Sequence, residues 1–224
     1  GSKKIDCNIH GKHDKTVPEA GELSVEIIKA IILKMINPSQ FAQSATSKET
    51  EKSPELPVRP PVLCAGCPHR GSFYAVKQAM KGQKTAYCGD IGCYTLGNAM
   101  PLDMTDTCLC MGADITMAQG FYHNEPDTHC FSFIGDSTFF ASGITGVVNA
   151  VYNQAKQTVC ILDNSTTAMT GHQPHPGTGV TMMGEIVEKV SIPKILEAVG
   201  VKPIIEVDPF DQEKAIAAVK EADA

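Results

Sequence analysis

The sequence has no long apolar run and no concentration of basic residues. Its longest candidate for a membrane span, "VEIIKAIILKMI" at residues 25–36, is interrupted by Lys29 and Lys34 and is shorter than the roughly 20 apolar residues of a spanning helix. Lysine and arginine form no stripe that could neutralise a line of phosphates, and the formal net charge is -6. We therefore expect a protein that binds neither membranes nor nucleic acid.

No secretory leader is visible, and the nine cysteines are an odd number. A secreted framework of paired disulfides is therefore not expected, and the cytoplasm is the expected compartment. In that compartment a close group of cysteines indicates a metal site or redox chemistry, whereas single cysteines often pack as small apolar residues. With 224 residues, of which 42% are hydrophobic, the chain is long enough for one domain with a substantial core.

Residues 1–61 are predicted to form an N-terminal helix followed by a linker. Between Gly21 and Asn37, apolar residues recur every three or four positions, which is typical of one face of an amphipathic helix. The segment Pro38–Pro61 is rich in Ser, Thr, Glu, Lys and Pro, and it has too few apolar residues to offset the entropy lost on ordering. We interpret it as a flexible linker to a second part, residues 62–224.

Residues 62–224 alternate between strand and helix patterns, which is typical of a parallel sheet with crossover helices. Strands are predicted in "KTAYCG", "THCFSFIG", "QTVCILDN" and "KPIIEV", and helices near Phe73–Met80, Ile115–Tyr122, Ser142–Asn153 and Asp211–Ala222. The expected fold class is α/β, with a parallel sheet and helices on both of its faces in three layers. Because a further strand would follow the last helix, we expect the domain to be truncated at its C-terminus.

An acid and an amide stand at the ends of two predicted strands. Asp136 follows "THCFSFIG", and Asn164 ends "QTVCILDN". The carboxyl ends of neighbouring parallel strands open into one crevice, so the two side chains should face each other, and their oxygens suit Mg²⁺ or Ca²⁺. Gly135 allows a sharp turn, while Ser137 and Thr138 begin a helix, where anions bind favourably. This pattern indicates a diphosphate held through a divalent cation; a simple turn with a helix-capping Asp136 is the alternative.

The same spacing resembles the thiamine diphosphate motif, Gly-Asp-Gly followed by Asn-Asn. Ser137 replaces the second glycine of that motif, and Asp163 replaces its first asparagine. The resemblance implies that Mg²⁺ is bound by Asp136, by Asn164 and by the main-chain oxygen of Thr166.

The segment "CLCMGADITMAQGF" resembles the part of these enzymes that carries an apolar wedge beneath the cofactor. Met111 would force the two cofactor rings into a V, and the carbonyl of Leu109 would face the aminopyrimidine. For a single methionine, core packing is the alternative interpretation. The other cofactor contacts that the resemblance implies are Gly92, Gly112, Met169 and Thr170.

A second chemistry is indicated by "CAGCPHRG", residues 64–71. A zinc ribbon would need a second Cys-x-x-Cys, and the sequence has none. A thioredoxin-like pair would open a helix directly after a strand, which does not fit the pattern well. Iron-sulfur ligation tolerates scattered spacing, so Cys64, Cys67 and either Cys88 or Cys93 could hold three corners of a cluster.

Five segments between Arg59 and Asp208 together resemble the thiamine diphosphate domain in the α subunit of indolepyruvate:ferredoxin oxidoreductases, which are 2-oxoacid:ferredoxin oxidoreductases. These segments are "RPPVLCAGCPHRGSFYA", "GDIGCYTLG", "DTCLCMGA", "GDSTFFASGITGVVNAVYN" and "LDNSTTAMTGHQPHPGTG". The resemblance implies oxidative decarboxylation of an aryl 2-oxoacid such as indolepyruvate, with coenzyme A as co-substrate and electrons passing through iron-sulfur clusters to ferredoxin. The implied partners are the pyrimidine-binding and ferredoxin-like domains of the α subunit, a smaller β subunit and ferredoxin, in a dimer-type assembly.

The resemblance also assigns ligands to a 4Fe-4S cluster. They are Cys64, Cys67 and Cys93, with Cys93 preferred over Cys88 because related enzymes have Gly-Ile-Gly-Cys where this chain has Asp-Ile-Gly-Cys. A fourth ligand is expected beyond Ala224, so the cluster should be incomplete or absent in this chain.

His172 and Gln173 are the candidates for a catalytic role, because they lie in a Gly- and Pro-rich loop that closes over the thiazolium in related enzymes. His175 in the same loop has less weight. The glutamate that activates the cofactor belongs to a domain absent here, so the isolated chain is expected to be inactive. Two alternatives remain: a non-oxidative thiamine diphosphate-dependent 2-oxoacid decarboxylase, which would need no cysteines, and a non-catalytic interaction module that binds a metal or a cluster.

Overall fold

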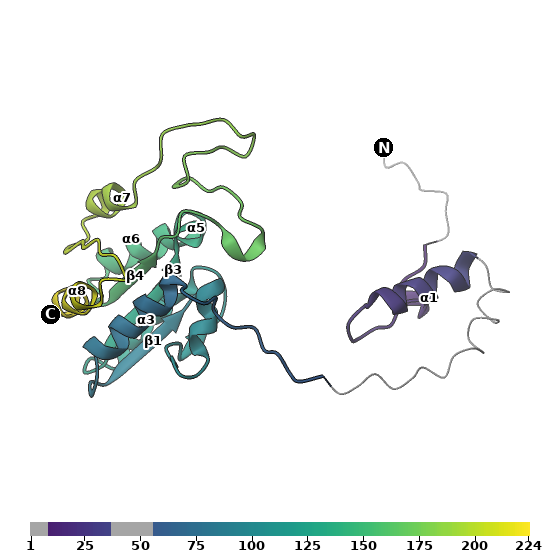
Figure 1. Cartoon of the computed structure of the whole chain (residues 1–224), viewed down its shortest axis with the longest axis horizontal. Helices are drawn as coiled ribbons and strands as arrows, with labels where there is room; N and C mark the ends of the chain where they lie inside the picture. Colours follow the sequence, from purple (N-terminus) through teal and green to yellow (C-terminus); the bar gives the residue numbers. More distant parts are fainter. Residues whose placement is uncertain (1–8, 37–55) are drawn as a thin grey trace. The chain divides into compact units, whose positions relative to one another are not determined.

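The computed structural model describes residues 9–36 and 56–224, and its contacts divide the chain into two units, Gly1–Val58 and Arg59–Ala224 (Figure 1). The predicted linker falls outside the described residues except for residues 56–61, which have no regular secondary structure. No helix in the part of the chain that the structure describes is both long and apolar enough to cross a membrane.

The first unit contains the predicted N-terminal helix. Helix α1 spans Val25–Ile36, inside the predicted range. The hydroxyl of Ser24 accepts the N–H of Ile27 at 3.4 Å, which caps the first turn of the helix. A short 3-10 turn, η1, precedes it at Lys12–Asp14.

The second unit alternates strands and helices as the sequence predicts. Its strands are β1 (Thr85–Gly89), β2 (Thr107–Cys108), β3 (His129–Gly135) and β4 (Thr158–Leu162). Its α-helices are α3 (Pro68–Ala79), α4 (Ala113–Asn124), α5 (Asp136–Thr138), α6 (Ile144–Tyr152), α7 (Ile192–Val199) and α8 (Gln212–Asp223). Shorter turns are η2 (Cys93–Asn98), the π-helical η3 (Phe139–Gly143) and η4 (Ala168–Thr170).

All four strands form one parallel sheet in the order β2-β1-β3-β4. Strand β3 is central, and six of its seven residues are buried, as a strand covered by helices on both faces requires. The register aligns Gly89 with Phe133 and Gly135 with Leu162. The carboxyl ends of β1, β3 and β4 therefore lie next to one another, and the predicted α/β class is confirmed.

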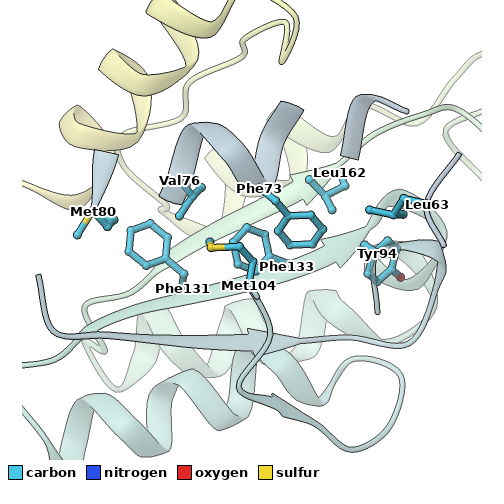
Figure 2. Packing of buried hydrophobic residues seen from close by; sticks show 9 residues of the cluster. All are labelled: Leu63, Phe73, Val76, Met80, Tyr94, Met104, Phe131, Phe133 and Leu162. Carbon is cyan, nitrogen blue, oxygen red and sulfur yellow. The ribbon is translucent and has the colours of Figure 1, made fainter. Parts of the chain in front are cut away.

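Helices α3 and α8 pack on one face of the sheet (Figures 1 and 2). Side chains alternate along a strand, so Phe131 and Phe133 of β3 both point into this layer, where they meet Phe73 and Val76 of α3. The rings of Phe73 and Phe133 lie 4.7 Å apart between centroids. This cluster is the core that supports the carboxyl ends of β1 and β3.

The opposite face is covered by α4 and α6, with α7 packed against α6. Ile115 of α4 and Val147 of α6 meet Ile134 of β3 in one cluster. Cys88 and Cys130 pack in a second cluster beneath α4, and burial raises the pKa of the Cys88 thiol to about 11. These two cysteines thus serve as small apolar core residues.

One strand prediction is wrong. The segment "KPIIEV", Lys202–Val207, forms no strand in the structure, although it borders the same hollow as β4. Pro203 has no N–H to donate to a ladder, and a hollow of about 590 Å³ separates the free edge of β4 from this segment. Strand β2 and helix α7 were not predicted: β2 has two residues, too few for an alternating pattern, and α7 has only eight.

Candidate functional site

The ends of β3 and β4 bring Asp136 and Asn164 together, as the sequence predicts. Asp136 is the first residue of α5, directly after β3, and Asn164 lies two residues beyond β4. The main-chain N–H of Asn164 donates to Asp136 Oδ2 at 3.2 Å, and the N–H of Ser137 donates to Asp136 Oδ1 at 2.8 Å. Both carboxylate oxygens are therefore held in fixed directions by the main chain.

The carboxyl of Asp136 is buried beside a second acid. Its residue is 2% exposed; burial raises its pKa, the nearby Asp163 carboxyl raises it further, and the imidazole of His175 opposes the shift. His175 Nε2 lies 3.1 Å from Asp136 Oδ2. The two atoms do not form a hydrogen bond, and Nε2 has no hydrogen-bond partner among the described residues. A cation beside Asp136 would relieve the repulsion between the two carboxylates.

The donor set at this position fits a hard divalent cation. Carboxylate, amide and main-chain oxygens are the ligands that Mg²⁺ prefers, and Asp136, Asn164 and Thr166 supply one of each. Asn164 Oδ1 accepts the N–H of Thr166 at 3.3 Å, which keeps the amide oxygen in the loop. Among the described residues, no group of three or more His, Cys, Asp or Glu side chains could hold a metal ion, so the amide and main-chain oxygens would be needed.

The loop after β4 is tied to the start of α5. The hydroxyl of Thr167 donates to Ser137 Oγ at 2.8 Å, and Ser165 adopts φ 55° to make the tight turn. Met169 and Thr170, in η4, are exposed on the same loop. The loop after β4 therefore lies next to the predicted diphosphate residues, which are Gly135, Ser137 and Thr138.

In the Gly- and Pro-rich loop, the buried polar residue is His175 and not His172 or Gln173, which the sequence favours for a catalytic role. His172 and Gln173 are exposed, and Gln173 bonds to Thr170 through both its amide atoms. His175 is instead buried against Asp136, with its ring 5.8 Å from that of Phe140. Nothing in the local sequence distinguishes His175 from His172, because its burial depends on η3 packing beside it.

Leu109 and Met111 of the predicted wedge segment lie between the end of β2 and the start of α4. Leu109 and Met111 are 72% and 51% exposed, so their side chains are free to contact a ligand. Gly112 has φ 82°, and a Cβ there would lie 2.5 Å from Ser142 Oγ, so only glycine fits. The same Ser142 hydroxyl donates to the carbonyl of Met111 at 3.3 Å. This close approach holds the main chain of the wedge against η3, which leads into α6.

The three predicted iron-sulfur cysteines share one region, but among the described residues they form no group of three or more side chains that could hold a metal ion. Burial raises the pKa of Cys93, and the Cys67 and Cys64 thiols raise it further, which places all three within electrostatic reach of one another. Cys67 Sγ lies 3.0 Å from His69 Nδ1. Cys88 packs on the α4 side of the sheet, whereas Cys93 packs with the α3 core, so Cys88 does not belong to this group.

Most of the second unit matches a known protein family. Residues 90–223 match the family described as "Thiamine pyrophosphate enzyme, C-terminal TPP binding domain", thiamine pyrophosphate being another name for thiamine diphosphate. The chain belongs to this thiamine pyrophosphate enzyme family. The match spans the wedge segment, Asp136, Asn164 and the loop that follows, and the predicted membership is confirmed.

Curated relatives extend the similarity to almost the whole chain. The indolepyruvate oxidoreductase subunit IorA of Methanothermobacter thermautotrophicus is 41% identical over 99% of this chain, and that of Archaeoglobus fulgidus is 40% identical over 96%. The chain spans only 36% and 35% of these two relatives. Among solved structures, the 2-oxoglutarate:ferredoxin oxidoreductase of Magnetococcus marinus has a TM-score of 0.64 at 19% identity, covering 75% of this chain and 61% of that one. That likeness shows the shared fold.

Within this thiamine pyrophosphate enzyme domain, Asp114 is a buried acid that the sequence did not single out. It lies in the first turn of α4 and is fully buried. Neither carboxylate oxygen has a hydrogen-bond partner among the described residues. Burial, followed by the charge of the nearby Asp90, raises the pKa of Asp114 to about 7. The folded protein therefore favours the protonated acid.

This predicts how stability changes with pH. The pKa of Asp114 is about 7 in the folded protein and 3.8 ordinarily. As the pH rises from 4 to 7, the carboxyl loses its proton in the unfolded chain but keeps it in the folded one. The free energy of unfolding therefore falls as the pH rises through this range. Asp114→Asn removes the titration. The difference in unfolding free energy between variant and wild type should rise by about 3 kcal/mol from pH 5 to pH 8, measured by urea denaturation. A difference that does not change with pH would contradict the assignment.

Proposed function

We propose that this chain binds thiamine diphosphate through Mg²⁺ and is the cofactor-binding part of an oxidoreductase that oxidatively decarboxylates aryl 2-oxoacids such as indolepyruvate. The observation that carries the proposal is the buried Asp136 carboxylate, fixed by two main-chain N–H groups at the paired ends of β3 and β4. The similarity to indolepyruvate oxidoreductase subunits supports the substrate class.

Different residues would bind different parts of the cofactor. Asp136, Asn164 and the main-chain oxygen of Thr166 would bind Mg²⁺, while the diphosphate would lie beside the start of α5. Met111 and Leu109 are exposed for contact with the rings. When bound, thiamine diphosphate supplies a carbon nucleophile and stabilises the negative charge left by decarboxylation. Gly92, Gly112, Met169 and Thr170 complete the proposed contacts.

The remaining cofactors and partners are part of the same proposal. Coenzyme A would accept the acyl group, and electrons would leave through a 4Fe-4S cluster bound by Cys64, Cys67 and Cys93 to ferredoxin. The chain spans about a third of its curated relatives, which supports further domains and a second subunit as partners. The cytoplasm is the proposed compartment.

Calorimetric titration tests the central claim. The purified chain should bind thiamine diphosphate in the presence of Mg²⁺, and addition of a chelator should abolish the signal, because the diphosphate is proposed to reach Asp136 only through the cation. Thiamine without its diphosphate is the matched control and should bind at least about 100-fold more weakly. Equal binding with and without Mg²⁺, or none in either condition, would overturn the proposed function.

A second expected result concerns iron. Cys64 is exposed and Cys67 and Cys93 are half-buried, so a cluster on these thiols would be open to oxidation. We expect little iron after purification in air and more after anaerobic purification, measured by iron and acid-labile sulfide analysis. Cys93→Ser should lose the anaerobic iron, while Cys88→Ser should keep it. About four irons per chain retained in air, or loss of iron on changing Cys88, would contradict these ligands.

A further inference from the structure

Two residues outside the predicted site form a buried connection between its parts. Asp90 directly follows β1, and Tyr94 lies in η2; they are 0% and 7% exposed. The main chain at Asp90 is itself fixed, because its N–H donates to the carbonyl of Phe133 in β3 at 3.2 Å and its carbonyl accepts the hydroxyl of Thr95 at 2.8 Å. Asp90 is thus anchored to the central strand.

The side chain of Asp90 reaches the wedge segment. Its Oδ1 accepts the main-chain N–H of Gly112 at 2.7 Å. Gly112 immediately follows Met111 and stands at the N-terminus of α4 in a left-handed conformation. A charged acceptor on this N–H gives a strong hydrogen bond, and its burial shields it from competing water. The direction in which the main chain leaves Met111 is therefore set by Asp90.

The other carboxylate oxygen leads to the diphosphate segment. Tyr94 donates its hydroxyl to Asp90 Oδ2 at 2.7 Å, and the same hydroxyl oxygen lies 3.2 Å from Thr138 Oγ1. Thr138, in α5, is 2% exposed. Gly112, Asp90, Tyr94 and Thr138 thus form one continuous chain of hydrogen bonds from the wedge to the start of α5.

The ring of Tyr94 fits tightly between two glycines. A Cβ at Gly92 would lie 2.4 Å from the ring carbon Cζ, and a Cβ at Gly135 would lie 2.6 Å from Cε1. Both positions therefore need glycine because the ring of Tyr94 fills the space. Figure 2 shows Tyr94 at one end of the apolar cluster, beside Leu63. The ring also lies 5.7 Å from that of the buried His69, measured between centroids.

We propose that Asp90 and Tyr94 are positioning residues that hold the wedge segment and the diphosphate segment in a fixed relation, so that one cofactor molecule meets both. This inference rests on the proposed function. Neither residue has to touch the cofactor: Asp90 acts through Gly112 and Tyr94 acts through Thr138. The two segments are separated by more than twenty residues of chain, and this buried link joins them through side chains.

Two probes on the full 224-residue chain separate the two arms of the link. Mg²⁺-pyrophosphate tests only the diphosphate segment, whereas Mg²⁺-thiamine diphosphate tests both segments. Tyr94→Phe removes the hydroxyl and keeps the ring, and Asp90→Asn keeps an acceptor for Gly112, whereas Asp90→Ala removes it. Tyr87→Phe is the matched control, because the ring of Tyr87 packs against Phe131 in the same core. Urea denaturation of every variant confirms that it is folded.

The expected pattern is specific. Tyr94→Phe should raise the Kd of both probes by about 5- to 10-fold. Asp90→Ala should raise the Kd of thiamine diphosphate at least 10-fold more than that of pyrophosphate, because Met111 is proposed to contact only the thiamine part. Asp90→Asn should restore most of this loss. Near-ultraviolet circular dichroism of the bound cofactor should change in Asp90→Ala and not in Tyr87→Phe.

Three results would overturn the inference in different ways. If the wild-type chain binds Mg²⁺-thiamine diphosphate and both Asp90→Ala and Tyr94→Phe bind it as tightly as Tyr87→Phe does, the link has no positioning role and the proposed function stands. Equal loss of both probes in Asp90→Ala also rejects the role in the wedge. If the wild type binds neither probe, the proposed function fails and this inference fails with it.

Discussion

Asp136→Ala is expected to abolish Mg²⁺-dependent binding of thiamine diphosphate. The carboxylate is the only charged ligand in the proposed set, and its two oxygens are already aimed by the N–H groups of Ser137 and Asn164. Loss of residues that merely support metal ligands costs 10- to 100-fold in metal affinity, so loss of the charged ligand itself should cost at least about 100-fold. Calorimetric titration of variant and wild type under the same Mg²⁺ concentration measures the loss.

Three further variants make this result interpretable. Asp136→Asn keeps the shape of the side chain without its charge and should also lose most of the affinity, which would show that charge and not packing is required. Asn164→Ala should weaken binding as well, because it removes the amide oxygen. Asp127→Ala, before the amino end of β3 and far from the proposed cation, should bind as the wild type does. Wild-type affinity in both Asp136→Ala and Asn164→Ala would remove the basis for a cation at this position.

The largest loss of stability is expected from Phe133→Ala. Phe133 is fully buried in the central strand, and its ring contacts Phe73 of α3 at 4.7 Å between centroids (Figure 2). Truncation leaves a cavity in a well-packed core, so the free energy of unfolding should fall by about 3–5 kcal/mol. Urea denaturation followed by far-ultraviolet circular dichroism gives this value directly.

Tyr74→Ala provides the matched comparison for Phe133→Ala. Tyr74 is an aromatic residue of the same helix α3, but it is 48% exposed, and its truncation should cost less than about 1 kcal/mol. A loss of similar size in both variants would indicate that the layer between α3 and β3 is not the main core. Because Phe133 lies two residues before Gly135, the Phe133→Ala variant should also bind Mg²⁺-thiamine diphosphate more weakly where it remains folded.

The sequence by itself was sufficient for the elements whose signal is local. Strands β1, β3 and β4 are recognisable because each is a short apolar run bounded by polar residues. Asp136 and Asn164 can be paired from the sequence alone, because the residues at the carboxyl ends of neighbouring parallel strands lie in one crevice whatever the rest of the fold does. The family resemblance rests on the same ordered motifs.

The tertiary structure alone decided which residues lie next to those of the proposed site. Asp90 meets Gly112 across 22 positions, Tyr94 meets Thr138 across 44, and His175 meets Asp136 across 39. The failure of "KPIIEV" to pair with β4 is of the same kind, since its apolar residues are typical of a strand while its backbone makes no ladder. The sequence could not predict these contacts for one physical reason. The burial of a residue and its hydrogen-bond partners depend on elements that are distant in the chain, and a local sequence pattern does not show which of those elements lie close in space.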